Sequence, residues 1–115
     1  MYNASAMNYN VIVKYTFGDI EAENRAIDEL MEADVKGLII NPVHGEYYNP
    51  KILKLVLDGF PVVLVDKFFK GINVPVISID HKKAMKDLTR YLISCNHTNI
   101  AIISTKSQNT SSIEE

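Results

Sequence analysis

This chain of 115 residues contains little of what marks several large classes of protein. Its single cysteine, Cys95, excludes an intrachain disulfide framework and is typical of a reducing compartment. No apolar run is long enough to span a membrane, and no signal peptide is visible at the N-terminus. The formal net charge of −2 provides no basic face for nucleic acid. We therefore expect a cytoplasmic chain that does not itself bind membranes or DNA.

Motifs for cofactors, metals and covalent catalysis are also missing. The glycines are scattered, so neither a dinucleotide-binding loop nor a P-loop is present, and no serine stands in G-x-S-x-G. His44, His81 and His97 lack the spacing of a zinc site. A metal held by His44 and His81 beside Asp66 or Asp80 is the weaker alternative. The sequence predicts no enzyme, no cofactor and no metal.

Three short apolar runs are present, and each ends in a polar cluster. The runs are Gly37–Ile40, Val62–Val65 and Val76–Ile79, followed by Asn41–His44, Asp66–Phe68 and Asp80–His81. Continuous apolar runs are typical of parallel strands that are buried on both faces. Ligands of open α/β sheets bind beyond the carboxyl ends of such strands. The three clusters therefore predict one edge of a ligand cleft.

Strand and helix patterns alternate along the chain. Two further strands are expected at Asn10–Tyr15 and at Ile100–Ser104, and helices are expected from Asp19 to about Asp34, from Asn49-Pro50 to Gly59, and after Asp80. Asp19, Asn49 and Asp80 are suited to cap these helices. Only the strands on either side of residue 70 follow one another directly. This order predicts an α/β fold with a doubly wound parallel sheet and right-handed crossovers.

The third helix has the clearest apolar stripe. Its members are Ala84, Met85, Leu88, Tyr91, Leu92 and Cys95. Such spacing favours a helix that packs on the sheet, with Cys95 as a buried structural thiol rather than a reactive one. Asn96 follows the helix, where asparagine tolerates the left-handed conformation.

Several segments together resemble the effector-binding domain of the lac repressor/galactose repressor family, which has the type I periplasmic binding protein fold. The matching stretches are Tyr9–Val13, Gly18-Asp19 with Glu23, Val35–Pro42, Gly59–Lys67, Ile79–His81, Ala84, Leu92-Ile93, His97 and Asn99–Ile103. The loop Asp66–Ile72 is similar to the branch with a winged-helix DNA-binding module, as in arabinose-type repressors. The family usually has Asp-Asn at Asp80-His81 and Gly-His at Asn96-His97.

The resemblance implies a domain organisation. Residues 1–98 correspond to most of the N-terminal lobe, and residues 99–115 to the start of a second lobe. Family members begin with a strand and a half helix that precede these residues. Both ends of the domain are thus expected to be truncated.

The resemblance also implies a function. The chain is expected to sense a sugar-like effector for a bacterial transcriptional regulator that dimerises and binds operator DNA through a module absent from this chain. Expected ligand contacts are Thr16, His44, Lys67, Phe68, Asp80, His81 and Thr110. Asp80 is expected to accept hydrogen bonds from hydroxyls, besides capping its helix, and Phe68 or Tyr47 to supply an apolar platform. The alternatives are a solute-binding protein of a sugar transporter and, from the enzyme class, a small doubly wound hydrolase or response-regulator-like domain.

Overall fold

The computed structural model describes residues 2–43 and 47–103. It divides the chain into two compact units, Met1–Lys36 and Gly37–Glu115, which are considered separately. Within the described residues no helix is long and apolar enough to cross a membrane.

The first unit contains helices α1 (Tyr2–Ala6) and α2 (Ile20–Glu32). Asp19 caps α2, as predicted, because its carboxylate accepts hydrogen bonds from the backbone N–H groups of Glu21 and Ala22 at 3.3 and 3.1 Å. On the surface of this unit, the Lys14 ammonium lies 2.5 Å from the Glu29 carboxylate. The hydrogen bond from Lys14 lowers the pKa of Glu29 below its usual value.

The strand predicted at Asn10–Tyr15 is wrong, because these residues are irregular in the structure. A strand needs a hydrogen-bonded neighbour, and none of the described residues pairs with this segment. Val11, Ile12 and Val13 are exposed for the same reason. The β-branched composition alone was therefore insufficient to form a strand here.

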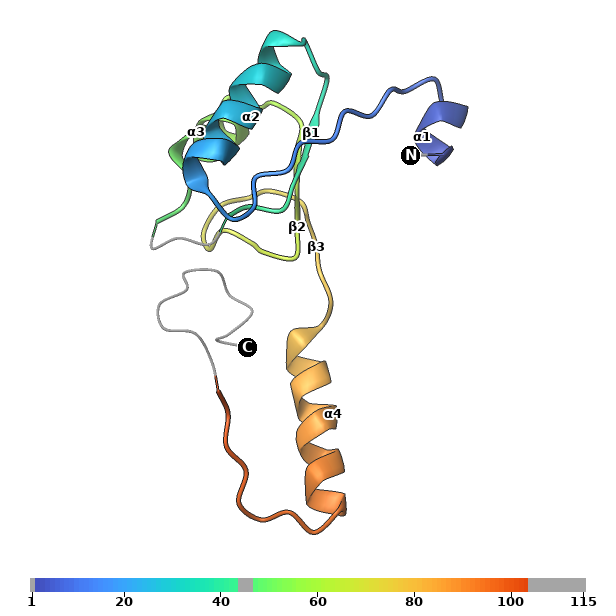
Figure 1. Cartoon of the computed structure of the whole chain (residues 1–115), viewed down its shortest axis with the longest axis vertical. Coiled ribbons are helices and arrows are strands. Elements are labelled where there is room, and N and C mark those ends of the chain that lie inside the picture. The colour runs from blue at the N-terminus through green and yellow to red at the C-terminus, as the bar shows by residue number, and fades with distance from the viewer. Residues whose placement is uncertain (1, 44–46, 104–115) are drawn as a thin grey trace. The chain divides into compact units, whose positions relative to one another are not determined.

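The second unit is built on a parallel sheet in the order β1 (Leu38–Ile40), β2 (Val62–Val65) and β3 (Val76–Ile77). Figure 1 labels the three strands and the helices. Helix α3 (Pro50–Leu57) connects β1 to β2, and helix α4 (His81–Ser94) follows β3. Leu38 pairs with Val62, and Leu64 pairs with Val76. The parallel α/β fold is thus as predicted, although β3 ends two residues earlier than expected.

Local signals correctly place the helices of this unit. Asn49 is buried, and its side chain accepts a hydrogen bond from the Lys51 backbone N–H at 2.9 Å, with Pro50 at the first helical position. Gly59, with φ +80°, ends α3. Asn96 likewise has φ +64° after α4.

The core of the second unit lies on one face of the sheet. Leu38, Val62 and Leu64 point to the buried face, and Ile52 of α3 is 0% exposed. On the opposite face Ile39 and Ile77 remain 79% and 68% exposed. Among the described residues, only one face of the sheet is therefore well covered.

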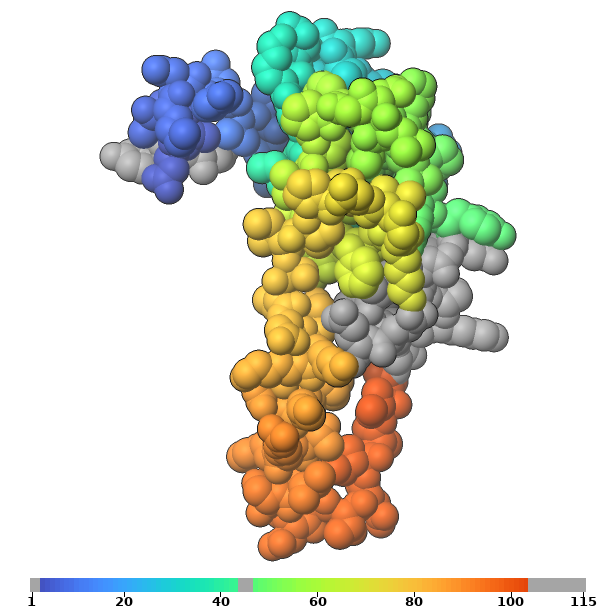
Figure 2. Space-filling model, turned by 180° about the vertical axis from the view of Figure 1, so that it is seen from behind, coloured from blue at the N-terminus to red at the C-terminus, as the bar shows by residue number. Residues whose placement is uncertain are grey.

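The structure corrects two predictions about α4 and the segment that follows it. None of the residues of α4 is buried, and Cys95 is exposed rather than a buried structural thiol. Much of the orange α4 surface in Figure 2 is uncovered. Ile100–Ile103 are irregular rather than a strand, because they pair with no described neighbour, and Ser104 lies outside the described residues. The apolar stripe of α4 thus has the expected spacing without the expected packing.

Candidate functional site

The carboxyl ends of β1 and β2 are joined by Lys67. Its Nζ donates a hydrogen bond of 2.9 Å to the backbone carbonyl oxygen of Pro42, which lies beyond the end of β1. Pro42 is fully buried and Lys67 is half-buried, so the contact lies at the surface of the core rather than in open solvent. Two of the three polar clusters predicted from the strand ends are therefore in direct contact.

Asp66 links the ends of β2 and β3. Its backbone N–H donates to the Ile77 carbonyl at 2.8 Å, while the Lys67 N–H donates back to the Val65 carbonyl at 2.8 Å. The latter bond closes a γ-turn in which Asp66 has φ +69°, a conformation that is unfavourable for a residue with a side chain. Strained backbone of this kind is often found at ligand clamps. The turn directs the chain from β2 toward Pro42.

His81 brings the third cluster to the same place. As the first residue of α4, it places its Nε2 atom 3.5 Å from Oδ1 of Asp66. Nε2 is buried and makes no hydrogen bond to any residue that the structure describes. The imidazole and the carboxylate therefore lie close together without a hydrogen bond, and the start of α4 lies beside the end of β2.

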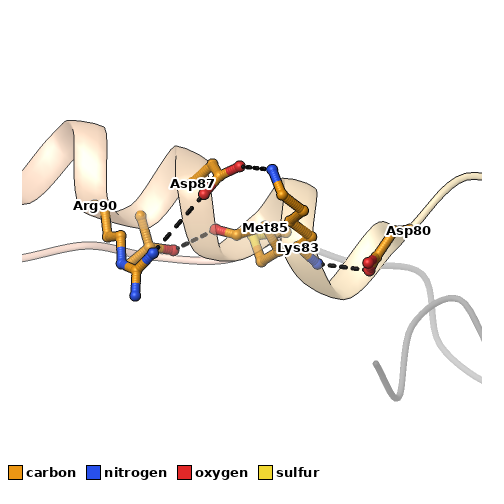
Figure 3. Close-up of polar contacts among 6 residues, drawn as sticks. Asp80, Lys83, Met85, Asp87 and Arg90 are labelled. Atoms are coloured by element: carbon orange, nitrogen blue, oxygen red, sulfur yellow. Dashed lines mark hydrogen bonds and ion pairs between the residues drawn. The ribbon is translucent and has the colours of Figure 1, made fainter.

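Asp80 caps α4, as the sequence predicted. Its Oδ1 accepts a hydrogen bond from the Lys83 backbone N–H at 2.8 Å, and Lys83 Nζ pairs in turn with Asp87 at 2.8 Å (Figure 3). The side chain of Asp80 is exposed. A carboxylate has about four lone-pair sites, so the cap leaves it able to accept hydrogen bonds from a ligand.

An aromatic pair holds the loop that carries Lys67 and Phe68. The ring of Phe69, which is 3% exposed, stacks on Tyr48 with centroids 4.3 Å apart and an interplanar angle of 18°. The Tyr48 hydroxyl accepts a hydrogen bond from the Lys70 N–H at 2.6 Å. Phe68 remains half-buried and Tyr47 is exposed, so both rings are accessible.

The structure thus brings together part of the predicted site. Lys67 and His81 lie in contacts that join the strand ends, and Asp80 is adjacent in the chain to His81. Thr16 is half-buried in a turn of the first unit, which is described by itself. His44 and Thr110 lie outside the described residues.

Sequence reasoning left three contributors out of its set of contacts. Asp66 was seen as a strand-end residue, but its positive φ cannot be inferred from its type. Tyr48 and Phe69 were not predicted as contributors, because their stacking depends on how the two loops fold. The one available signal was the concentration of aromatic residues in both loops.

Hydrogen-bond acceptors, an imidazole and aromatic rings lie at or near the strand ends, and these residue types occur in small-molecule binding sites. Lys67 is engaged with a carbonyl oxygen, and no nucleophilic side chain faces a base in the contacts between the strand ends. Among the described residues, no group of three or more His, Cys, Asp and Glu side chains is placed to hold a metal ion.

Comparison with known proteins identifies the family of this chain. A family model described as periplasmic binding proteins and sugar binding domain of the LacI family matches residues 2–115. The probable HTH-type transcriptional regulator EndR of Paenibacillus polymyxa is 33% identical over 97 residues, which is 84% of this chain and 28% of that protein. No solved structure matches.

Two further relatives are regulators by name. The arabinose metabolism transcriptional repressor of Halalkalibacterium halodurans is 26% identical over 99 residues, covering 84% of this chain and 26% of that protein. Catabolite control protein A of Priestia megaterium is 26% identical over 101 residues, covering 88% of this chain and 30% of that protein. The chain spans less than a third of the length of these relatives. With a family match over almost its whole length, the chain belongs to the family of periplasmic binding proteins and LacI-type sugar-binding domains.

Proposed function

We propose that this chain is part of the sugar-sensing domain of a bacterial transcriptional regulator. The observation that carries the proposal is the convergence of three strand ends, through Lys67 with Pro42 and Asp66 with His81, in a chain of this family. Ligands of open α/β sheets bind at this edge. The three relatives named above are all regulators, which favours this role over that of a solute-binding protein for a transporter.

Each strand end has its own part in the proposed site. Asp80 and Asp66 accept hydrogen bonds from sugar hydroxyls, and Lys67 keeps the β2 end against the β1 end. Phe68 or Tyr47 offers a ring to an apolar sugar face. We retain Thr16, His44, His81 and Thr110 as further proposed contacts.

The charge of the site bears on the class of ligand. Two carboxylates, Asp66 and Asp80, lie at this edge, whereas the Lys67 ammonium is turned to the Pro42 carbonyl. Like charges in proximity repel, so a phosphate or carboxylate group on the ligand is disfavoured. We infer an uncharged polyhydroxyl ligand, and arabinose is a suitable first probe because one relative is named for arabinose metabolism.

Signalling follows from closure of two lobes. Residues 1–98 form most of one lobe, and residues 99–115 begin the other. A sugar that binds the closed arrangement more tightly shifts the population toward it. The separate DNA-binding module of the cytoplasmic regulator then changes its affinity for operator DNA, and no turnover of the sugar is involved.

We also propose that the intact protein forms a homodimer. Helix α3 offers an exposed apolar residue, Leu57, next to the charged pair Lys54–Asp58. Light scattering of the intact protein tests this part, and we expect a dimer that Leu57→Asp weakens. A monomer at micromolar concentration contradicts it.

A thermal-shift screen tests the sugar assignment. The intact protein is heated with arabinose, ribose or galactose, and with the phosphate esters of the same sugars as matched charged controls. A ligand at 100 times its Kd stabilises the native state by about 2.7 kcal/mol. We expect a free sugar to raise the melting temperature more than its phosphate. If no sugar raises it, the assignment fails.

A further inference from the structure

The carboxylate of Asp66 and the imidazole of His81 face one another with an incomplete contact. Asp66 Oδ1 lies 3.5 Å from His81 Nε2, and the two side chains are 48% and 27% exposed. This separation is longer than a usual N–H···O hydrogen bond. The buried Nε2 atom makes no other hydrogen bond within the described residues. Leaving a buried polar atom unpaired is unfavourable, so a small closing movement of these side chains is favoured.

The backbone on both sides of this contact is fixed. Asp66 is held by its N–H bond to Ile77 and by the γ-turn to Lys67. His81 begins a helix whose first turn is held by the Asp80 cap on Lys83. Only the side-chain torsions of Asp66 and His81 remain to adjust their contact. Once these torsions bring Nε2 within hydrogen-bond distance of Oδ1, the imidazole restricts how the Asp66 carboxylate can turn.

We propose that His81 is a positioning residue of the sugar site, which acts through Asp66. The imidazole holds Oδ1 of Asp66, and the second carboxylate oxygen is then directed to a sugar hydroxyl. A proton on Nε2 of the imidazole supplies the donor for this bond. This inference rests on the proposed function and adds a determinant of affinity that need not touch the sugar itself.

A double-mutant cycle on sugar affinity tests this role. Arabinose, ribose and galactose are each titrated into the intact protein, and into its His81→Ala, Asp66→Asn and doubly substituted variants. We expect His81→Ala to weaken binding about tenfold in the natural background, which corresponds to about 1.4 kcal/mol. In the Asp66→Asn background, His81→Ala is expected to weaken binding little further, because the carboxylate that His81 positions is already absent.

Two further variants separate positioning from folding. His81→Gln keeps an N–H donor near the same place and is expected to recover part of the lost affinity, whereas His81→Ala does not. Lys82→Ala, at the next and exposed position of α4, is the matched control and should bind sugar like the natural protein. Melting temperatures without sugar show whether each variant is folded.

The outcomes distinguish this inference from the proposed function. Unchanged affinity of a folded His81→Ala variant overturns the inference alone. Equal losses from His81→Ala in both backgrounds also overturn it, because His81 then acts independently of Asp66. If the natural protein binds none of the three sugars, the proposed function fails and the inference fails with it.

Discussion

Lys67 Nζ donates a hydrogen bond of 2.9 Å to the carbonyl oxygen of Pro42, across 25 positions of sequence. The bond connects the segments beyond two neighbouring parallel strands, so it fixes the spacing of the proposed site at its edge. The ammonium group of Lys67 is hydrogen-bonded within the protein rather than directed to an anionic ligand. The lysine is thus better suited to shaping the site than to attracting a charged ligand.

Removing this ammonium tests that role. Lys67→Met keeps most of the aliphatic chain and is expected to lower the free energy of unfolding by about 1 kcal/mol, because the Pro42 carbonyl loses its donor. It should also weaken sugar binding. Lys86→Met, at an exposed position of α4, is the matched control and should change neither quantity. Urea unfolding measures the stability, and equal values for the two variants contradict the structural role of Lys67.

The left-handed conformation of Asp66 gives a second prediction. At φ +69° a Cβ atom is unfavourable, and glycine adopts this conformation freely. Both Asp66→Gly and Asp66→Ala lose the carboxylate, so their comparison isolates the backbone effect. We expect the glycine variant to be more stable by about 1 kcal/mol in urea unfolding. An alanine variant of equal or greater stability argues against the γ-turn.

The pair Lys14–Glu29 predicts a dependence of stability on pH. The pKa of Glu29 is lowered in the folded chain by the hydrogen bond and charge of Lys14. Its stabilising contribution is therefore fully present above the ordinary carboxyl pKa, and it is lost as the pH falls through the lowered value. Glu29→Gln should be less stable than the natural protein at pH 7 and equally stable in strong acid. Thermal unfolding followed from pH 7 into strong acid measures this.

Both partners are exposed to solvent, so salt should screen the difference. A gap between Glu29→Gln and the natural protein that persists in strong acid, or in high salt at pH 7, has another cause than this ion pair.

The core prediction concerns Ile52. This side chain of α3 is fully buried, whereas Leu57 of the same helix is exposed. Ile52→Ala leaves a cavity and is expected to cost about 2–5 kcal/mol of unfolding free energy, measured by chemical denaturation. Leu57→Ala should cost far less. Comparable losses at both positions contradict the packing of α3.

Sequence patterns predicted best what depends on neighbouring residues along the chain. The caps Asp19, Asn49 and Asp80 were found because the capped N–H groups lie two or three residues away. The three central strands were also found, because their apolar runs are continuous. Family resemblance added the expected function to this local information.

Predictions failed where structure depends on distant partners. The segment Asn10–Tyr15 has the composition of a strand, but no described strand pairs with it. The apolar stripe of α4 has helical spacing, but no described residues bury it, so Cys95 is exposed. Asp66 was expected at the cleft edge, but its left-handed conformation was not predicted, because Val65, Lys67 and Ile77 set it together. Composition specifies which element a segment can form, whereas pairing decides whether it forms.

The most direct test of the account is calorimetric titration of arabinose, ribose and galactose into the intact protein and its Asp80→Asn variant. Asparagine caps helices about as well as aspartate, so the fold should be retained while the carboxylate acceptor is lost. We predict saturable binding of one sugar per chain by the natural protein, weakened at least tenfold in Asp80→Asn at an almost unchanged melting temperature. Absence of binding by the natural protein, or equal affinity in the variant, contradicts a sugar site at these strand ends.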